Sequence, residues 1–315
     1  MTARLGLGLA AVGRPAYITS GRAQDLPGDR SPAALERRAR ELLDAAYELG
    51  IRHLDTARSY GRAEEFLAGW LHDHPDHQDL TVASKWGYTY TADWRTDAEV
   101  HEVKDHSVDA FERQIGETRA QLGSLLDLYQ IHSVTPDSPA LHDTALHHRL
   151  AELAAEGVLI GLSTSGPRQS DTILTALGLT VDGERLFQSF QTTWNLLEPS
   201  AGDALAEAHA AGCLVVVKEA LANGRLVDPT GDEPTTAVLT RLAADLDTTP
   251  DAVALAAALR QPWVDVVLSG AVTPAQLAHN VCATTLEADP WQAGLPTPTE
   301  PAEQYWRRRS QRPWT

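Results

Sequence analysis

Apolar positions recur along this chain with two different periods, which alternate from one segment to the next. Short apolar runs of five to eight residues have the spacing of β-strands, and the stretches between them repeat apolar residues every three or four positions, as amphipathic helices do. The predicted strands are 5–12, 51–55, 80–85, 126–132, 159–164, 187–193, 213–218 and 264–269. The predicted helices are 33–49, 63–74, 108–122, 141–156, 168–177, 201–211, 236–246, 250–259 and 274–288.

Eight strands, nearly all followed by helices, predict an α/β fold, the (β/α)8 or TIM barrel, as a single domain over residues 1–315. The alternative is a doubly wound sheet, which needs a phosphate-binding turn after an early strand. Gly6 and Gly8 begin a loose GxGxxA pattern there, but almost no chain precedes it and Pro15 breaks the helix that should follow. The barrel is therefore favoured.

Polar residues stand at the C-terminal ends of the predicted strands, where barrel enzymes place their chemistry. Asp55 ends the second strand and Tyr60 lies in the loop after it, while Lys85 and His132 end the third and fourth strands. The chain has only three lysines, and Lys85 and Lys218 both stand at strand ends. Because lysine is a compact charge whose pKa shifts on burial, this placement favours a function over chance.

The segments around these residues resemble the aldo-keto reductases. The matching motifs are Asp55-Thr-Ala-Arg-Ser-Tyr60-Gly, Ala83-Ser-Lys85, Tyr129-Gln-Ile-His132, Gly161-Leu-Ser163, Gln191-x-x-Trp194-Asn-Leu-Leu and Val272-Thr-Pro-x-Gln-Leu-x-x-Asn280. They occur in the family's order over nearly the whole chain. The resemblance implies a TIM barrel that binds NADP(H) across its mouth and reduces carbonyls to alcohols, or catalyses the reverse.

The resemblance also implies catalytic roles for Asp55, Tyr60, Lys85 and His132. Tyr60 would be the general acid, and Lys85, held by Asp55, would lower the pKa of its phenol from about 10. His132 would orient the substrate carbonyl, and the hydride chemistry would belong to the nicotinamide. Each residue alone has an ordinary structural explanation, so it is their occurrence together that favours catalysis.

Cofactor-binding residues follow from the same resemblance. They are Ser163, Thr164, Gln191, Lys218, Ser269, Gly270, Gln276 and Asn280. Two features depart from the family pattern. Lys218-Glu219 replaces an aromatic that would stack on the nicotinamide, so Trp194 supplies that stacking or it is absent. The stretch 269–276 holds no basic residue for a 2′-phosphate. NADP is the expected cofactor, with NAD as the alternative.

Aromatic residues in the loops are the candidates for substrate binding. They are Tyr17, Trp86, Tyr88 and Trp94, with Trp86 expected in the pocket wall because it directly follows Lys85. The tail 301–315 is either an aromatic flap beside the pocket or a solvated end. These residues fit an aldehyde or ketone with an apolar group, and equally a sugar carbonyl.

Charge and cysteine content exclude several classes of partner. A net charge of −17 argues against nucleic acid and anionic membranes, and no apolar run is long enough to span a bilayer. Cys213 and Cys282 are too few for a disulfide framework, which favours a cytoplasmic setting. The cluster at 72–77 holds three histidines but falls at a helix end, so we expect no metal site. The oligomeric state does not follow from the sequence.

Two other functions stay open on the same residues. Lys85 or Lys218 could be the Schiff-base nucleophile of a non-redox barrel enzyme. The chain could also be a nucleotide-binding regulatory protein that has lost catalysis, although the intact catalytic set argues against this. A short-chain dehydrogenase is disfavoured because no Tyr-x-x-x-Lys occurs.

Overall fold

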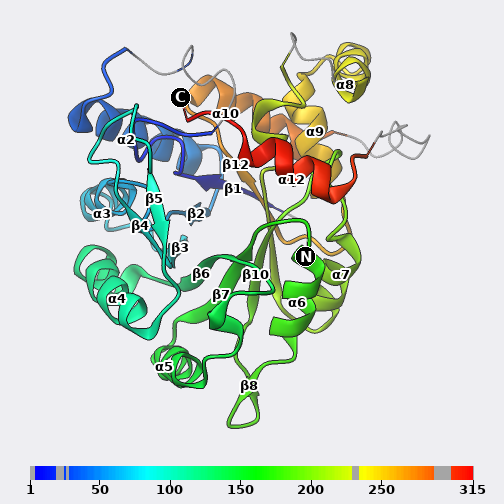
Figure 1. The fold of residues 1–315 in the computed structure, drawn as a ribbon. Coiled ribbons are helices and arrows are strands. Elements are labelled where there is room, and N and C mark those ends of the chain that lie inside the picture. Colours follow the sequence, from blue (N-terminus) through cyan, green and yellow to red (C-terminus); the bar gives the residue numbers. More distant parts are fainter. Residues whose placement is uncertain (1–3, 19–24, 26–27, 229–233, 287–298, 315) are drawn as a thin grey trace.

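The computed structural model describes residues 4–18, 25, 28–228, 234–286 and 299–314. Eight parallel strands close into a barrel, with helices arranged around it (Figure 1). In the order of the chain these strands are β1 (Arg4–Gly8), β2 (His53–Asp55), β3 (Thr81–Trp86), β6 (Leu128–Val134), β7 (Leu159–Thr164), β10 (Ser189–Thr193), β11 (Leu214–Lys218) and β12 (Val266–Ser269). Strand β1 pairs with both β2 and β12, which confirms the predicted TIM barrel.

The α-helices of the described segments follow the predicted order, except for the last, which was not predicted. They are α2 (Pro32–Glu48), α3 (Ala63–Asp73), α4 (Val108–Leu122), α5 (Thr144–Ala155), α6 (Gln169–Leu177), α7 (Gly202–Ala210), α8 (Pro234–Asp245), α9 (Pro250–Leu259), α10 (Pro274–Val281) and α12 (Ala302–Ser310). Helix α2 shows why these segments are helical. Ser31 caps its first turn by accepting a hydrogen bond from the Ala34 amide, and Pro32 is pre-set for the first helical position. Its apolar stripe, which includes Leu35 and Leu42, is buried.

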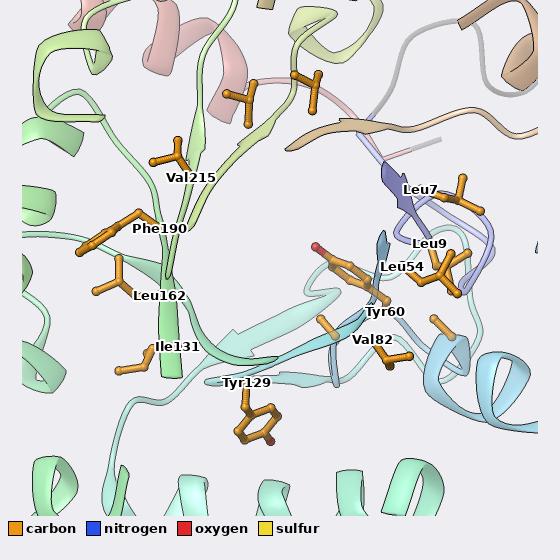
Figure 2. Close-up of a cluster of buried hydrophobic side chains, with 14 of the residues drawn as sticks. Leu7, Leu9, Leu54, Tyr60, Val82, Tyr129, Ile131, Leu162, Phe190 and Val215 are labelled. Carbon is orange, nitrogen blue, oxygen red and sulfur yellow. The ribbon is translucent and has the colours of Figure 1, made fainter. Parts of the chain in front are cut away.

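Alternation along the strands separates an apolar outer face from a more polar interior. Leu162, Phe190 and Val215 belong to the main core, and in Figure 2 their side chains point away from the ring of strands. Side chains one position further along, such as Gln191, lie on the opposite face. Tyr60 lies inside the ring of strands in the same view. Each strand therefore packs the helices with one face and can present polar groups with the other.

Three predicted elements differ from the structure by three or more residues at one end. The predicted strand 5–12 ends at Gly8, because the Val12 and Gly13 amides turn back to the Leu9 carbonyl. The predicted helix 141–156 begins at Thr144, after an Asp143 cap and a short 3-10 turn. The predicted helix 274–288 stops at α10 and continues as a 3-10 turn over 282–284, and its last two positions lie outside the described residues.

Several elements have no counterpart in the prediction. A hairpin of β4 (Tyr88–Tyr90) and β5 (Glu102–Lys104) occupies the loop after β3, and a small hairpin, β8 (Thr180–Val181) with β9 (Glu184–Arg185), precedes β10. Helix α12 lies beside α9 (Figure 1), and its Tyr305 and Trp306 are buried in an apolar cluster with residues of α8 and α9. The tail is thereby fixed to the barrel over 302–310.

The histidine-rich turn after α3 is an aromatic stack. The rings of Tyr47 and His77 lie 3.5 Å apart at their centroids, and those of His74 and His77 lie 4.9 Å apart. His74 also bonds the Trp70 carbonyl at 2.8 Å. Within the described segments no group of three or more His, Cys, Asp or Glu residues is placed to hold a metal ion. Cys213 and Cys282 are both free thiols.

None of the helices in the described part of the chain combines the length and the apolar character that crossing a bilayer requires.

Candidate active site

A cavity of about 390 Å³ opens at the C-terminal ends of the barrel strands. Its lining comes from the ends of β1, β2, β6, β10, β11 and β12, from the loops that follow them, and from the last turn of α12 and the residues after it. Nine residues of the predicted catalytic and cofactor sets meet in this lining, among them Asp55, Tyr60, His132 and Gln191. The eightfold closure thus gathers residues far apart in sequence around one space.

Lys85 is fully buried beneath this cavity, and three neighbours hold its ammonium group. Its Nζ donates to Asp55 Oδ1 at 2.5 Å and to the Thr56 carbonyl at 2.9 Å, and lies 3.4 Å from the Tyr60 hydroxyl oxygen. The pairing of β2 with β3 sets Asp55 opposite Ala83, so Lys85 projects inward two residues further along. Gln191 donates to the other Asp55 oxygen at 2.8 Å, which fixes the carboxylate from across the barrel.

The Tyr60 phenol differs from the sequence expectation. Burial, followed by the negative charge of Asp55, holds the pKa of Tyr60 well above its usual value. Burial and the Asp55 carboxylate thus outweigh the lowering expected from Lys85, whose part in proton transfer stays a prediction. The phenol keeps its proton at neutral pH, as a proton donor must.

His132 stands beside this phenol. The two rings are edge to face with centroids 5.5 Å apart, and His132 Nδ1 lies 3.5 Å from Ser59 Oγ. Burial, and then the positive charges of Lys85, Lys218 and Arg14, hold the pKa of His132 well below its usual value. The imidazole is therefore neutral and carries one N–H that can be donated into the cavity.

The main chain at His132 is itself held in place. His106 Nε2 donates to the His132 carbonyl at 2.8 Å, and the other His106 nitrogen bonds Ser138 Oγ at 2.7 Å. Ser133 adopts a φ of 58°, and its amide donates to Ser163 Oγ at 2.8 Å. These contacts bend the chain at the end of β6 and fix the direction in which the imidazole points.

The predicted cofactor residues divide between the cavity and its supporting layer. Gln191, Lys218, Ser269, Gly270, Gln276 and Asn280 line the cavity. Ser163 and Thr164 are fully buried and lie outside this lining. Ser163 accepts from the Ser133 amide, and Thr164 Oγ1 bonds Gln169 Oε1 at 3.0 Å. Ser163 therefore links β7 to β6 and Thr164 links β7 to α6, and Ser165 takes their place in the lining.

Lys218 and Glu219 form the wall where the family pattern leads one to expect an aromatic. Lys218 Nζ donates to Thr193 Oγ1 at 2.8 Å, and burial lowers the pKa of Lys218 to about 8. Glu219 adopts a φ of 56° and receives Arg309 Nε at 2.9 Å. Although burial alone would raise it, the charges of Arg309 and Lys218 bring the pKa of Glu219 to about 2. This ion pair connects α12 to the barrel mouth.

Of the predicted substrate residues, only Tyr17 and Tyr88 line the cavity. Trp86 does not, because side chains alternate along β3 and Lys85 already points inward. Its ring packs on Phe111 at a centroid distance of 5.2 Å.

Two further tryptophans expected near the site also lie elsewhere. Trp94 packs on Phe66 at 6.5 Å, and its indole N–H donates to the Arg30 carbonyl at 2.8 Å. Trp194, the alternative partner for a nicotinamide ring, packs on Trp263 at 5.8 Å and lies outside the lining.

Arg14, in the first loop, and Trp314, in the tail that the sequence left open as a flap or a solvated end, both line the cavity. Arg14 lies over the Tyr60 ring at 5.2 Å and the Trp314 ring at 4.6 Å, and it pairs with Glu102 at 2.8 Å. Trp314 also stacks flat on His101 at 4.3 Å. The Trp and Arg residues of the tail were a visible signal, but nothing in the pattern indicated that Trp314 docks on His101, next to the β4–β5 hairpin.

The arrangement therefore presents a protonated phenol and a neutral imidazole to one space, with an ammonium behind the phenol. Such a set can bind a carbonyl oxygen and deliver a proton to it.

Comparison with known proteins agrees with this chemistry. The aldo/keto reductase family model matches residues 22–293. A protein from Pseudomonas aeruginosa assigned to the aldo-keto reductases is 26% identical in sequence, with a TM-score of 0.65 and 90% of each chain covered. An aldo-keto reductase from Bacillus halodurans in its holo form shares the fold, with a TM-score of 0.67, 24% identity, and coverage of 98% of this chain and 92% of that one.

A curated relative, aldo-keto reductase str7 of Strobilurus tenacellus, is 32% identical over 126 residues. That stretch is 39% of this chain and spans about a third, 33%, of the relative's length. The extent of the family match is decisive: the chain belongs to the aldo/keto reductase family. It is an NAD(P)-dependent oxidoreductase on a TIM barrel.

Proposed function

We propose that the cavity binds a nicotinamide dinucleotide and a small carbonyl substrate, and that Tyr60 supplies the proton when the carbonyl is reduced to an alcohol. The observation that carries this proposal is the buried cluster at the cavity floor. There the Tyr60 hydroxyl lies 3.4 Å from Lys85 Nζ, and Asp55 holds that ammonium at 2.5 Å. Nothing in barrel packing requires a buried lysine and carboxylate beside a phenol, so a catalytic task explains them best.

The roles follow from charge and proton state. The bound nicotinamide supplies or accepts the hydride. The neutral His132 donates a hydrogen bond to the carbonyl oxygen and orients it. Tyr60 transfers its hydroxyl proton to that oxygen as negative charge develops there, and the Lys85 ammonium stabilises the phenolate that remains. Asp55 keeps the ammonium in position and takes no proton. The reverse reaction starts from the phenolate.

The residues present fit such a cofactor. Gln191 and Lys218 lie in the part of the lining nearest the catalytic cluster, and Ser269, Gly270, Gln276 and Asn280 continue it along β12 and α10. An elongated dinucleotide needs a lining of this kind, with polar side chains at intervals.

The substrate class is an aldehyde, a ketone or a sugar carbonyl. The aromatic rings of Tyr17 and Tyr88 border the space in front of His132, and the Tyr88 and His132 rings are 5.1 Å apart. Such walls favour a small substrate with an apolar face. We also propose a cytoplasmic setting, which suits the two free thiols.

The alternatives from the sequence are less well supported. The chain is an oxidoreductase by family, and Lys85 is fully buried among three partners, which leaves no room for an imine. The convergence of Asp55, Tyr60, Lys85 and His132 also argues against a regulatory protein without catalysis.

The variant Tyr60→Phe tests the proposal. It removes one hydroxyl and keeps the ring, so carbonyl reduction should fall by about a thousandfold, within the range of a lost general acid. Tryptophan quenching by NADH and NADPH should give dissociation constants within about twofold of wild type, about 0.4 kcal/mol. Near-full turnover in Tyr60→Phe would refute the general-acid role.

A further inference from the structure

We infer that the β12–α10 end of the cavity selects a dinucleotide with a free ribose 2′-hydroxyl, so that the enzyme prefers NAD(H) to NADP(H). This inference rests on the proposed function, because it assumes that the cofactor's adenosine lies near Asn280. It departs from the NADP expected by resemblance. Two carboxylates in the lining carry it, Asp25 and Asp251.

Gln276 binds the first of these carboxylates, that of Asp25. Its side-chain oxygen accepts from the Val272 amide at 2.9 Å, and its Nε2 donates to Asp25 Oδ2 at 2.8 Å. The Gln276 amide in turn donates to the N-cap side chain, Thr273 Oγ1, at 3.1 Å, so both ends of Gln276 are tied to the start of the helix. Gln276 is therefore fixed in place, and it directs its donor at a carboxylate.

Asn280 binds the second carboxylate, that of Asp251. With its amide oriented to satisfy both ends, the nitrogen donates to Asp251 Oδ2 at 2.8 Å and to the Gln276 carbonyl at 3.3 Å, while the oxygen accepts from Ser269 Oγ at 2.8 Å. Both N–H groups of this buried side chain are thereby used. The remaining lone pairs of Asp251 and Asp25 are therefore the acceptors that a ligand meets in this part of the lining.

The N-terminus of α10 offers a phosphate few hydrogen-bond donors to offset its repulsion by these carboxylates. Helix N-termini attract anions through free amides. In α10, however, Pro274 has no N–H and the Gln276 amide is capped by Thr273. Asp251 itself occupies the first turn of α9, where the helix dipole stabilises its carboxylate.

The cations of the lining are engaged elsewhere. Arg14 pairs with Glu102, Arg309 pairs with Glu219, and Lys218 donates to Thr193. Arg312 donates to the Ile18 carbonyl at 3.1 Å and to the Asn223 carbonyl at 2.9 Å. Among the described residues 269–280, none is basic except His279, which is not in the lining. A 2′-phosphate at this end would meet two carboxylates, whereas a 2′-hydroxyl could donate to either one.

Fluorescence titration of the purified protein with NADH and NADPH tests the inference without turnover. Wild type should bind NADH at least about tenfold more tightly, a difference of about 1.4 kcal/mol. Asp251→Asn removes one charge at constant shape and should bring the ratio of the two dissociation constants toward one. Gln276→Arg should invert it. Asp171→Asn, the same charge change on the exposed surface of α6, should leave the ratio unchanged.

Three results would count against the inference, and they are distinguishable. Tighter binding of NADPH by wild type would overturn it while leaving the proposed function intact. An unchanged ratio in both Asp251→Asn and Gln276→Arg would show that these side chains do not read the ribose. Failure of wild type to bind either nucleotide would overturn the proposed function itself.

Discussion

Asp55 has both carboxylate oxygens committed, one to Lys85 and one to Gln191, inside a region closed to solvent. A buried charge with a partner is tolerated, whereas one that loses its partner costs several kcal/mol. The ion pair therefore has a structural role beside the catalytic role that we propose for it. Its two functions can be separated because stability responds to net charge, whereas catalysis needs the ammonium itself.

Asp55→Asn should lower the free energy of unfolding by about 3 kcal/mol, because Lys85 would be left as an unpaired buried cation. The double variant Asp55→Asn/Lys85→Met removes both charges and should recover most of that loss, yet remain inactive. Urea unfolding of the two single variants and the double variant measures this coupling. Strictly additive losses would show that the two side chains are not energetically paired.

Helix α12 holds the tail against the barrel mouth by two kinds of contact. Tyr305 and Trp306 are buried in the apolar cluster over α8 and α9, and Arg309 pairs with Glu219 at the end of β11. Beyond the helix, Trp314 rests between His101 and Arg14. The apolar contacts anchor the helix, and the ion pair determines where its last turn lies over the cavity.

Glu219→Gln should therefore affect substrate binding more than folding. The helix keeps its apolar anchor, so the melting temperature should fall by only a few degrees, about 1 kcal/mol. The last turn loses its charge partner, and KM for carbonyl substrates should rise several-fold with kcat little changed. Thermal unfolding and steady-state kinetics measure both. A large loss of stability with unchanged KM would mean that the pair serves folding alone.

The barrel as a unit should be sensitive to acid because it buries neutral histidines. Burial lowers the pKa of both His53 and His106 to about 4, and that of His132 also lies well below its usual value. An unfolded chain binds these protons near pH 6.5 and the folded chain does not, so the free energy of unfolding falls as pH drops from about 6.5 to 4. Each histidine contributes up to about 3 kcal/mol over that range.

The variant His53→Gln should flatten this pH dependence, whatever its effect at neutral pH. His148→Gln, on the exposed side of α5, is the matched control and should keep the wild-type slope. Urea unfolding at several pH values between 4 and 7 gives the slopes. Equal slopes in wild type and His53→Gln would show that His53 titrates freely in the folded protein.

The sequence was sufficient for the barrel and for much of its mouth, for physical reasons. Strand and helix periods differ, and parallel strands align their C-terminal ends, so Asp55, Lys85 and His132 had to converge once the barrel was inferred. The phase of alternation was misjudged at one position. Lys85 points inward, and Trp86 must then point outward into the helices. Successive side chains along a strand point to opposite faces, so an error of one position assigns a residue to the wrong face.

Other features depended on contacts between distant segments. The pairing of Glu219 with Arg309 spans 90 residues, and that of Gln276 with Asp25 spans 251. No local pattern encodes such partners. The proton state of Tyr60 depends on burial and on the balance between the charges of Asp55 and Arg14, which only the three-dimensional arrangement reveals. Sequence therefore identified the residues better than it described their electrostatics.

The pH dependence of kcat/KM for carbonyl reduction tests most directly whether a protonated Tyr60 is the acid. Because the pKa of Tyr60 lies well above its usual value, the rate should stay flat from about pH 6 to 9. Lys218, whose pKa is about 8, also lines the cavity, so the profile is measured in Lys218→Met as well. A flat profile in that variant supports the account. A fall with an apparent pKa below about 8 that persists in Lys218→Met would contradict it.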